Sequence, residues 1–239
     1  ITSFLHVISD GEDEIGGKKA YGARDNNGII DIQLGQDRSD RWGDGKVAEH
    51  FIYNEALGTA HINIIRNYLG AKYQIDLGTN DLYLHDDIYR FNLGGIGRES
   101  QFDLHQDAQG TGIVRINNPT SLDNGDYFMW ADNNEGHSNW LTNLSPFETK
   151  MISRIWQVEE VGTIESVDVS IALEALPEND LEYVILISTQ PDFSQNNEAY
   201  KMSLVNDTLT STIDFSDDAY FTIISANDLQ IQLINEGYS

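Results

Sequence analysis

Short apolar runs recur along most of this chain between turn-forming residues, and this recurrence constrains the fold more than any other feature. The runs Tyr127–Trp130, Val167–Leu173 and Tyr183–Ile187 show it most clearly. Glycine, asparagine and aspartate occupy the intervals, and these residues favour tight turns between neighbouring strands. Strands spaced at roughly 8 to 20 residues with polar turns are typical of sandwiches. We therefore predict an all-β fold made of one or more antiparallel β-sandwiches.

One amphipathic helix interrupts the strands. From Thr59 to Tyr73, apolar and aromatic residues recur at steps of three and four, which is the spacing of one helix face. Gly58 is expected to stop the preceding segment, and Thr59 is expected to cap the helix. The face predicted to be buried consists of Ile64, Ile65, Tyr68, Leu69 and Tyr73, and the face predicted to be polar consists of Asn63, Arg66, Asn67 and Lys72.

The helix also marks the predicted domain boundary. Residues 1–75 hold strand candidates at Phe4–Ile8, Ile29–Leu34 and Val47–Tyr53 together with the helix, a partial set of concanavalin-like or laminin-G-like strands. Residues 76–228 hold the regular series of strands and form the predicted β-sandwich domain. Residues 229–239 are predicted to be a tail or an edge strand.

The charge balance excludes some classes of partner. The chain has 14 Lys and Arg against 39 Asp and Glu, a net charge of -25, so its surface should repel phosphate backbones and anionic lipid. No apolar run approaches the ~20 residues that span a bilayer. We expect no nucleic-acid partner and no membrane insertion. Because the chain starts without Met, we expect a processed product or an excised fragment.

Several phrases resemble a known arrangement of bacterial surface domains. IYNEAL at Ile52–Leu57 and RNYLGAKY at Arg66–Tyr73 resemble the closing strand and following helix of laminin-G-like, concanavalin-type modules in large secreted proteins of gliding Bacteroidota. The β domain that follows such modules is similar in the phrases GGIGRES at Gly94–Ser100, YFMWADNNE at Tyr127–Glu135, SRIWQVEEVG at Ser153–Gly162, VDVSIAL at Val167–Leu173 and YFTI at Tyr220–Ile223. The resemblance implies an extracellular or cell-surface location.

From these features we predict a non-catalytic extracellular module of a bacterial surface adhesin or fibre, with a structural or interaction role. Its expected partners are other domains or copies of the surface protein. The alternative is a carbohydrate-binding, lectin-like module, in which exposed aromatic rings such as Trp140 and Trp42 stack on sugars. Trp130 and Trp156 lie inside strand patterns and are predicted to be in the core.

A remote alternative is a jelly-roll glucanase. Glu178, Asp180 and Glu182 have the E-x-D-x-E spacing that places three carboxylates on one face of a strand. Pro177 precedes them and Asn179 lies among them, a pattern that favours a turn. We therefore predict no catalytic residue.

Two oxygen-rich loops flank the YFMW strand and are the candidate calcium ligands. Asp123 and Asp126 precede the strand, and Asp132 and Glu135 follow it. Ca²⁺ takes six to eight hard oxygen ligands, so convergence of such loops can form a site. The other reading is that both loops are ordinary solvated turns. The histidines are scattered without H-x-x-x-H spacing, which gives little support to a zinc site.

A glycine-rich phrase, Gly94–Gly97, lacks the lysine of a phosphate-binding loop and is predicted to permit a tight turn. By resemblance, Arg98, which follows Gly97 in the phrase GIGR, is expected to pair with a carboxylate or to cap carbonyl groups.

Overall fold

The computed structural model describes residues 3–5, 8–9, 12–13, 19–21, 48–51, 53, 56–144 and 149–237. Its contacts divide the chain into two compact units, Ile1–Leu57 and Gly58–Ser239. The dividing point lies before the helix and not after it, so the helix belongs to the larger unit. This differs from the predicted boundary at residue 75, because the helix packs on strands that come later in the sequence.

The smaller unit contains two antiparallel strand pairs. β1 (Ser3–Leu5) pairs with β4 (Lys19–Tyr21), and β2 (Ile8–Ser9) pairs with β3 (Glu12–Asp13). The predicted strand at residues 29–34 and Trp42 lie outside the described residues. Residues 48–51 and 53 are not in a strand, so the prediction of a strand there is wrong for the part that is described.

The larger unit is an antiparallel β-sandwich, which confirms the predicted fold class. Its nine-stranded sheet has the order β10-β11-β18-β12-β9-β5-β6, with β14 also pairing with β18 and β15 pairing with β14. Its five-stranded sheet has the order β16-β17-β13-β8-β7. The strands of the first sheet are β5 (Phe91–Ser100), β6 (Asp103–His105), β9 (Tyr127–Asp132), β10 (Leu141–Leu144), β11 (Thr149–Met151), β12 (Trp156–Val161), β14 (Glu182–Ser188), β15 (Glu198–Lys201) and β18 (Tyr220–Ala226). Those of the second are β7 (Asp107–Ala108), β8 (Val114–Asn117), β13 (Ser166–Ala172), β16 (Ser203–Val205) and β17 (Thr208–Asp214).

The main core lies between the two sheets. Side chains of β9 alternate, so Phe128 and Trp130 join this core while Tyr127 and Met129 point to the other face of the nine-stranded sheet. Burial on both faces explains why this strand is apolar at almost every position. Trp130 and Trp156 are each 1% exposed, which confirms their predicted place in the core.

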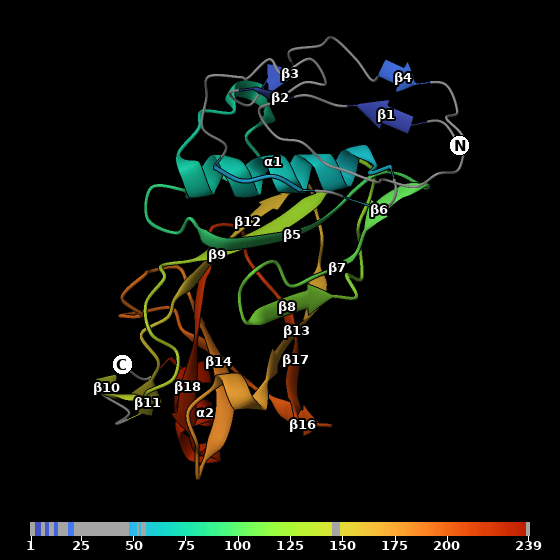
Figure 1. The fold of residues 1–239 in the computed structure, drawn as a ribbon. Helices are drawn as coiled ribbons and strands as arrows, with labels where there is room; N and C mark the ends of the chain where they lie inside the picture. Colours follow the sequence, from blue (N-terminus) through green and yellow to red (C-terminus); the bar gives the residue numbers. More distant parts are fainter. Residues whose placement is uncertain are drawn as a thin grey trace. The chain divides into compact units, whose positions relative to one another are not determined.

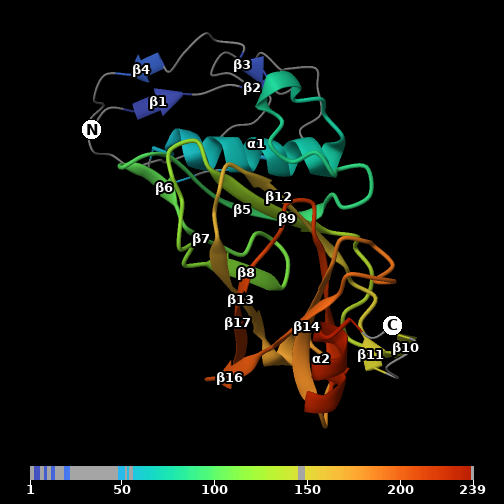
Figure 2. The same cartoon turned by 180° about the vertical axis from the view of Figure 1, so that it is seen from behind.

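Helix α1 (Thr59–Tyr73) has the bounds predicted from its periodicity and lies across β5 and β9 in both ribbon views (Figure 1 and Figure 2). Its N-cap residue is Gly58, and no side chain of the segment itself caps it. The cap comes from a distant residue: the Asp103 carboxylate accepts hydrogen bonds from the backbone N–H groups of Thr59 (2.6 Å) and Ala60 (3.1 Å). The prediction that Thr59 caps the helix is therefore wrong.

The buried face of α1 is only partly the predicted one. Ile64 and Tyr68 pack toward the sheet, but Tyr73 is exposed and Asn67 is 1% exposed. Asn67 is buried because its amide serves the next segment: its Oδ1 accepts from the backbone N–H of Leu82 (2.8 Å), and its Nδ2 donates to the carbonyl of Asn80 (3.2 Å). Burial of a polar side chain costs little folding free energy when its donor and acceptor groups are hydrogen-bonded.

The glycines at 94–97 lie inside strand β5 and not in a turn, so that prediction is wrong. A Cβ atom at Gly94 would lie 2.7 Å from Trp130, and one at Gly97 would lie 2.2 Å from Tyr127. These glycines leave room for the aromatic rings of β9 to cover the backbone of β5. Arg98 donates from Nη1 to the carbonyl of Leu122 (3.0 Å), which confirms its predicted role in capping carbonyl groups.

The C-terminal segment forms helix α2 (Asp228–Asn235) where we predicted a tail or an edge strand. Asn227 and Gln230 form a reciprocal capping box at its start, and Ile234 is buried in a cluster with residues of β14 and β18.

Two short 3-10 helices, η1 (Gly78–Asn80) and η2 (Leu173–Ala175), complete the elements. Within the described residues, no helix combines the length and apolar character needed to cross a membrane.

Candidate functional site

The four candidate calcium ligands lie at the two ends of β9. Asp123 and Asp126 precede this six-residue strand, and Asp132 closes it, so the two pairs are separated by roughly 20 Å of extended backbone. Asp132 is fully buried and already engaged, since its carboxylate lies 3.2 Å from Nη1 of Arg154 and accepts from Nδ2 of Asn92 (3.0 Å). The structure does not bring the four residues together.

The aromatic candidate Trp140 is held in place by its neighbours. Its Nε1 donates to the carbonyl of Glu178 (2.9 Å), and its ring lies 6.1 Å from the ring of Tyr183, measured between centroids. The half-buried ring packs against the main core. Trp42, the other aromatic candidate, lies outside the described residues.

The three carboxylates of the glucanase alternative do not share a strand. Glu178 and Asp180 are exposed in the connection that leads into β14, and only Glu182 belongs to the strand. Glu182 forms an ion pair with Lys201 (2.9 Å). The connection agrees with the turn that Pro177 and Asn179 favour.

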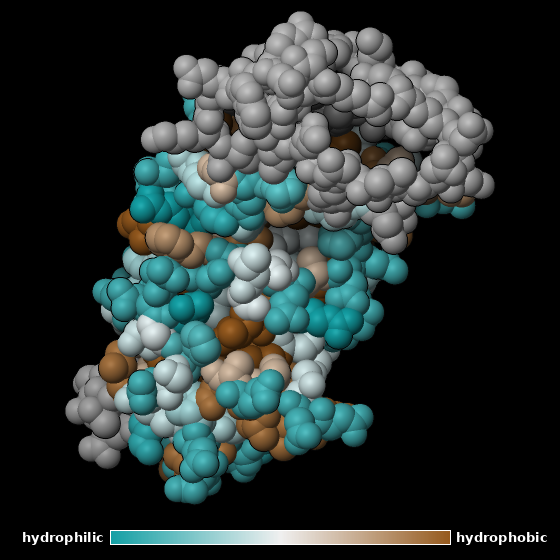
Figure 3. Space-filling model, in the orientation of Figure 1, coloured by the Kyte–Doolittle hydropathy of each residue, from teal (hydrophilic) through white to brown (hydrophobic). Residues whose placement is uncertain are grey.

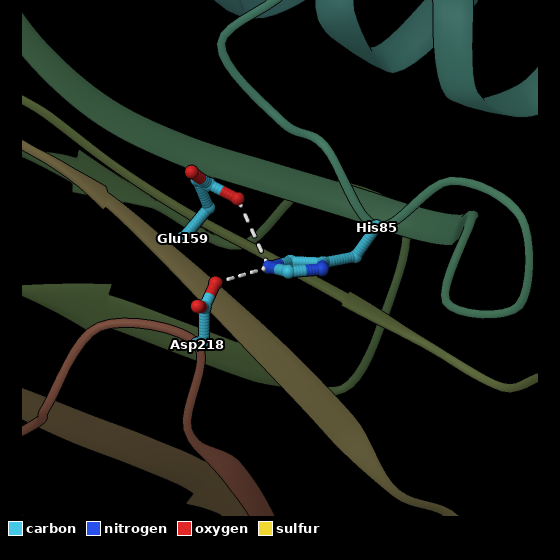
Figure 4. Close-up of side chains that lie close together, drawn as sticks. All are labelled: His85, Glu159 and Asp218. Carbon is cyan, nitrogen blue, oxygen red and sulfur yellow. Dashed lines mark ion pairs between the residues drawn. The ribbon is translucent and has the colours of Figure 1, made fainter.

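A cluster that the sequence did not indicate joins His85, Glu159 and Asp218. The Nε2 atom of His85 lies 2.9 Å from Oε2 of Glu159 and 2.9 Å from Oδ1 of Asp218 (Figure 4). Among the residues that the structure describes, this is the one group of three or more His, Asp or Glu side chains whose potential ligand atoms all lie within 4.8 Å of one another. It contains none of the predicted site residues.

Three separate segments bring these side chains together. His85 lies in the segment between η1 and β5, Glu159 lies in β12, and Asp218 lies in the connection between β17 and β18. Backbone hydrogen bonds hold the last two in register, since Val158 N–H donates to the carbonyl of Ala219 (2.9 Å). The backbone N–H of Leu84 donates to Oε2 of Glu159 (3.3 Å), which ties the histidine segment to β12.

The histidine is partly buried between aromatic and acidic groups. Tyr83, 1% exposed, presents its ring at right angles to the imidazole with 5.6 Å between centroids. Burial lowers the pKa of His85, but the carboxylates of Glu159 and Asp218 raise it by more, so the pKa lies above that of an ordinary imidazole. The Nε2 atom is inaccessible to solvent and makes short ionic contacts with both carboxylates.

The surroundings of the cluster are acidic. Burial and the nearby charges of Asp86, Asp76 and Glu159 raise the pKa of the Asp81 carboxyl. Burial, with the charge of Asp87, also raises the pKa of Asp86. Negative charge therefore exceeds positive charge around His85, and the arrangement can hold a cation in addition to or in place of the imidazolium proton.

Comparison with protein families places most of this architecture in one family. Residues 61–219, which are 159 of the 239 residues, match the family described as Domain of unknown function (DUF8202). The chain belongs to the DUF8202 family. The matched region of the DUF8202 domain contains His85, Glu159 and Asp218 and ends one residue after the last of them. Neither the comparison with curated proteins nor the comparison with solved structures gives a match.

A small pocket lies on the DUF8202 domain where the end of β14 approaches the end of β17. Its volume is about 260 Å³, and it is lined by Ile187, Ser188, Thr189, Asn196, Glu198, Asp214, Phe215 and Ser216. Glu198 accepts a hydrogen bond from the hydroxyl of Tyr200 (2.6 Å), which with burial and the charge of Asp214 raises the pKa of Tyr200 to about 12. Its lining combines carboxylates with serine and threonine hydroxyls, groups that can bind a small polyhydroxylated ligand.

The DUF8202 domain also presents an open strand edge. β16 pairs with β17 on one side, and on its other side no strand of the described part of the chain pairs with it. Leu204 and Val205 are 55% and 61% exposed. Asn206 and Asp207, with φ of 50° and 60°, form the left-handed two-residue turn that joins β16 to β17.

Proposed function

We propose that this chain is a non-catalytic module of an extracellular bacterial surface adhesin or fibre, and that its role is to associate with neighbouring copies. The observation that supports the proposal is the exposed edge of β16. An unpaired edge offers a row of N–H and C=O groups to another strand, and proteins that avoid such pairing place charges or proline on it. β16 has neither, and its sequence Ser203–Leu204–Val205 is uncharged.

Pairing between two copies of β16 suits the charges beside it. An antiparallel pair centred on Leu204 has two-fold symmetry and brings Lys201 of one copy toward Asp207 of the other. Leu204 would then face Leu204 of the other copy, and Val205 would face Ser203. Elsewhere hydrophilic residues dominate the face drawn in Figure 3, as the net charge of -25 implies.

The double variant Leu204→Lys/Val205→Lys is expected to abolish self-association. The wild-type chain should form dimers or larger species in sedimentation velocity experiments at high protein concentration. Association should be stronger in about 0.15 M salt than at low salt, because a Debye length of roughly 8 Å screens the repulsion between acidic surfaces. The double variant should remain a monomer because like charges would face each other across the edge.

Gln101→Lys/Gln106→Lys is the matched control. It makes the same change in net charge at exposed positions outside β16 and should associate like the wild type. A wild-type chain that stays monomeric at every concentration and salt would contradict the proposal, and so would equal loss of association in both double variants.

A carbohydrate-binding role is the second candidate, and the pocket beside Glu198 and Asp214 favours it. If the pocket holds a sugar, Asp214→Asn should abolish glycan-array binding, while Trp140→Ala should leave it unchanged because that ring packs against the core. Loss of binding with Trp140→Ala alone would instead restore the aromatic site predicted from the sequence. A wild-type chain that binds no glycan removes this candidate.

A further inference from the structure

The cluster of His85, Glu159 and Asp218 has the donor set of a metal site. It offers one imidazole nitrogen and two carboxylate oxygens, supplied by a loop, a strand and an inter-strand connection (Figure 4). Two of the three side chains are largely sheltered, with 19% exposure for His85 and 11% for Glu159, and the third, Asp218, is 67% exposed. The cluster therefore reaches solvent through Asp218.

The distances agree with shared coordination. Two ligand atoms that bind one ion at about 2.1 Å are about 3.4 Å apart in tetrahedral geometry and about 3 Å apart at right angles. Nε2 of His85 lies 2.9 Å from each carboxylate oxygen, which fits ligands at right angles better than tetrahedral ones. A hydrogen-bonded histidinium would aim its N–H at one oxygen. Here Nε2 is inaccessible to solvent and faces one oxygen of each carboxylate at the same distance.

The cluster contains more negative charge than one imidazolium can balance. Two carboxylates meet the histidine directly, so one imidazolium leaves one negative charge uncompensated. A doubly charged ion that replaces the proton on Nε2 compensates this surplus better.

We propose that His85, Glu159 and Asp218 bind one divalent ion of the zinc or manganese class. An imidazole ligand favours zinc or another transition metal, and the two carboxylates also suit manganese, whereas calcium takes oxygen ligands. The ion would connect the segment between η1 and β5 to β12 and to the β17–β18 connection. The chain has no cysteine, so a metal would be its means of cross-linking these segments strongly.

Calorimetric titration tests the site directly. After treatment with EDTA and dialysis, the whole chain should bind Zn²⁺ or Mn²⁺ at a ratio of one. At a hundredfold excess of free metal over Kd, the melting temperature should rise by about 5–10 °C, given typical domain unfolding entropies. Co²⁺ should give a visible d–d absorption band, a readout that does not depend on stability.

Two variants and one control make the test specific. His85→Gln should remove binding, and Asp218→Asn should weaken it at least about tenfold, the usual loss when a ligand set is damaged. Asp218 is exposed, so its variant should fold normally. The control is His61→Gln/His105→Gln, because those rings lie 4.5 Å apart and offer another place for zinc; it should bind as the wild type does.

Three results would overturn the proposal. The wild type could bind neither metal, which would identify the cluster as an ion triad around a protonated histidine. Binding could survive in His85→Gln, or it could disappear in the His61 and His105 control, which would place the metal elsewhere. None of these results bears on association through β16, which the sedimentation experiment tests separately.

Discussion

Replacing Gly97 by valine is expected to destabilise the domain by about 3 kcal/mol or more, because the added side chain overfills a closed interface. A Cβ atom at this position lies 2.2 Å from Cδ1 of Tyr127. The tyrosine cannot swing away, since its ring is 2% exposed and its hydroxyl is bonded to Glu99 and to Nδ2 of Asn63. Urea denaturation followed by tryptophan fluorescence measures the loss.

Gly136→Val is the control for this prediction. No atom lies within 4 Å of a Cβ built at Gly136, so its free energy of unfolding should stay within about 0.5 kcal/mol of the wild-type value. Equal stability of the Gly97 variant and the control would show that β5 and β9 adapt to the extra volume.

Asp132→Ala is expected to cost about 3–5 kcal/mol, the usual effect of removing one partner from a buried ion pair. Its carboxylate is fully buried and accepts from Asn92 Nδ2 and from the backbone N–H of Asn134 (2.8 Å). Without it, the guanidinium of Arg154, whose residue is 8% exposed, loses its carboxylate partner. Thermal and urea unfolding both report this loss.

Two variants define the cause. Asp132→Asn keeps an acceptor for Asn92 and Asn134 and should lose less stability than Asp132→Ala. Asp180→Ala removes a carboxylate from an exposed position and should be nearly neutral. If Asp132→Ala were as stable as Asp180→Ala, the buried ion pair would contribute nothing to the free energy of unfolding. Another group would then balance the charge of the Arg154 guanidinium.

The strands that sequence reasoning located are those whose patterns are local. β13 was predicted at 167–173 and occupies Ser166–Ala172, because its apolar residues alternate with polar ones. Helix α1 was predicted with its observed bounds for the same reason, since periodicity is a property of the segment alone. Such features need no knowledge of what packs against them.

Features that depend on distant partners were missed. The glycines at 94–97 were predicted to permit a tight turn, and only the rings of Tyr127 and Trp130 in β9 explain why glycine is needed in strand β5. Asn67 was predicted to lie on the polar face of α1 because its side chain is polar. It is buried because its hydrogen-bond partners lie in the following loop, which the helix pattern does not reveal. Helix α2 was not predicted, although the sequence contains a signal for its start: Asn227 and Gln230 have the spacing of a capping box.

The cluster of His85, Glu159 and Asp218 had no signal in the sequence. His85 and Glu159 are 74 residues apart, and Glu159 and Asp218 are 59 residues apart, so no motif spacing joins them. The candidate ligands that did look clustered, Asp123 with Asp126 and Asp132 with Glu135, are close in sequence but lie at opposite ends of one strand. Proximity along the chain did not predict proximity in space here, because the sandwich brings together side chains from strands and connections that are far apart in sequence.

The distant cap of α1 determines where this chain can be cut. The helix begins at Thr59, but the carboxylate that accepts its first N–H groups belongs to Asp103, 44 residues later. A fragment that ends after the helix would keep every residue of that helix but lose the carboxylate that accepts hydrogen bonds from its first backbone N–H groups. A fragment that begins after the helix would leave Asp103 without the amides it binds. Any excised piece that preserves this structure therefore starts before Gly58 and extends beyond the β5–β6 hairpin.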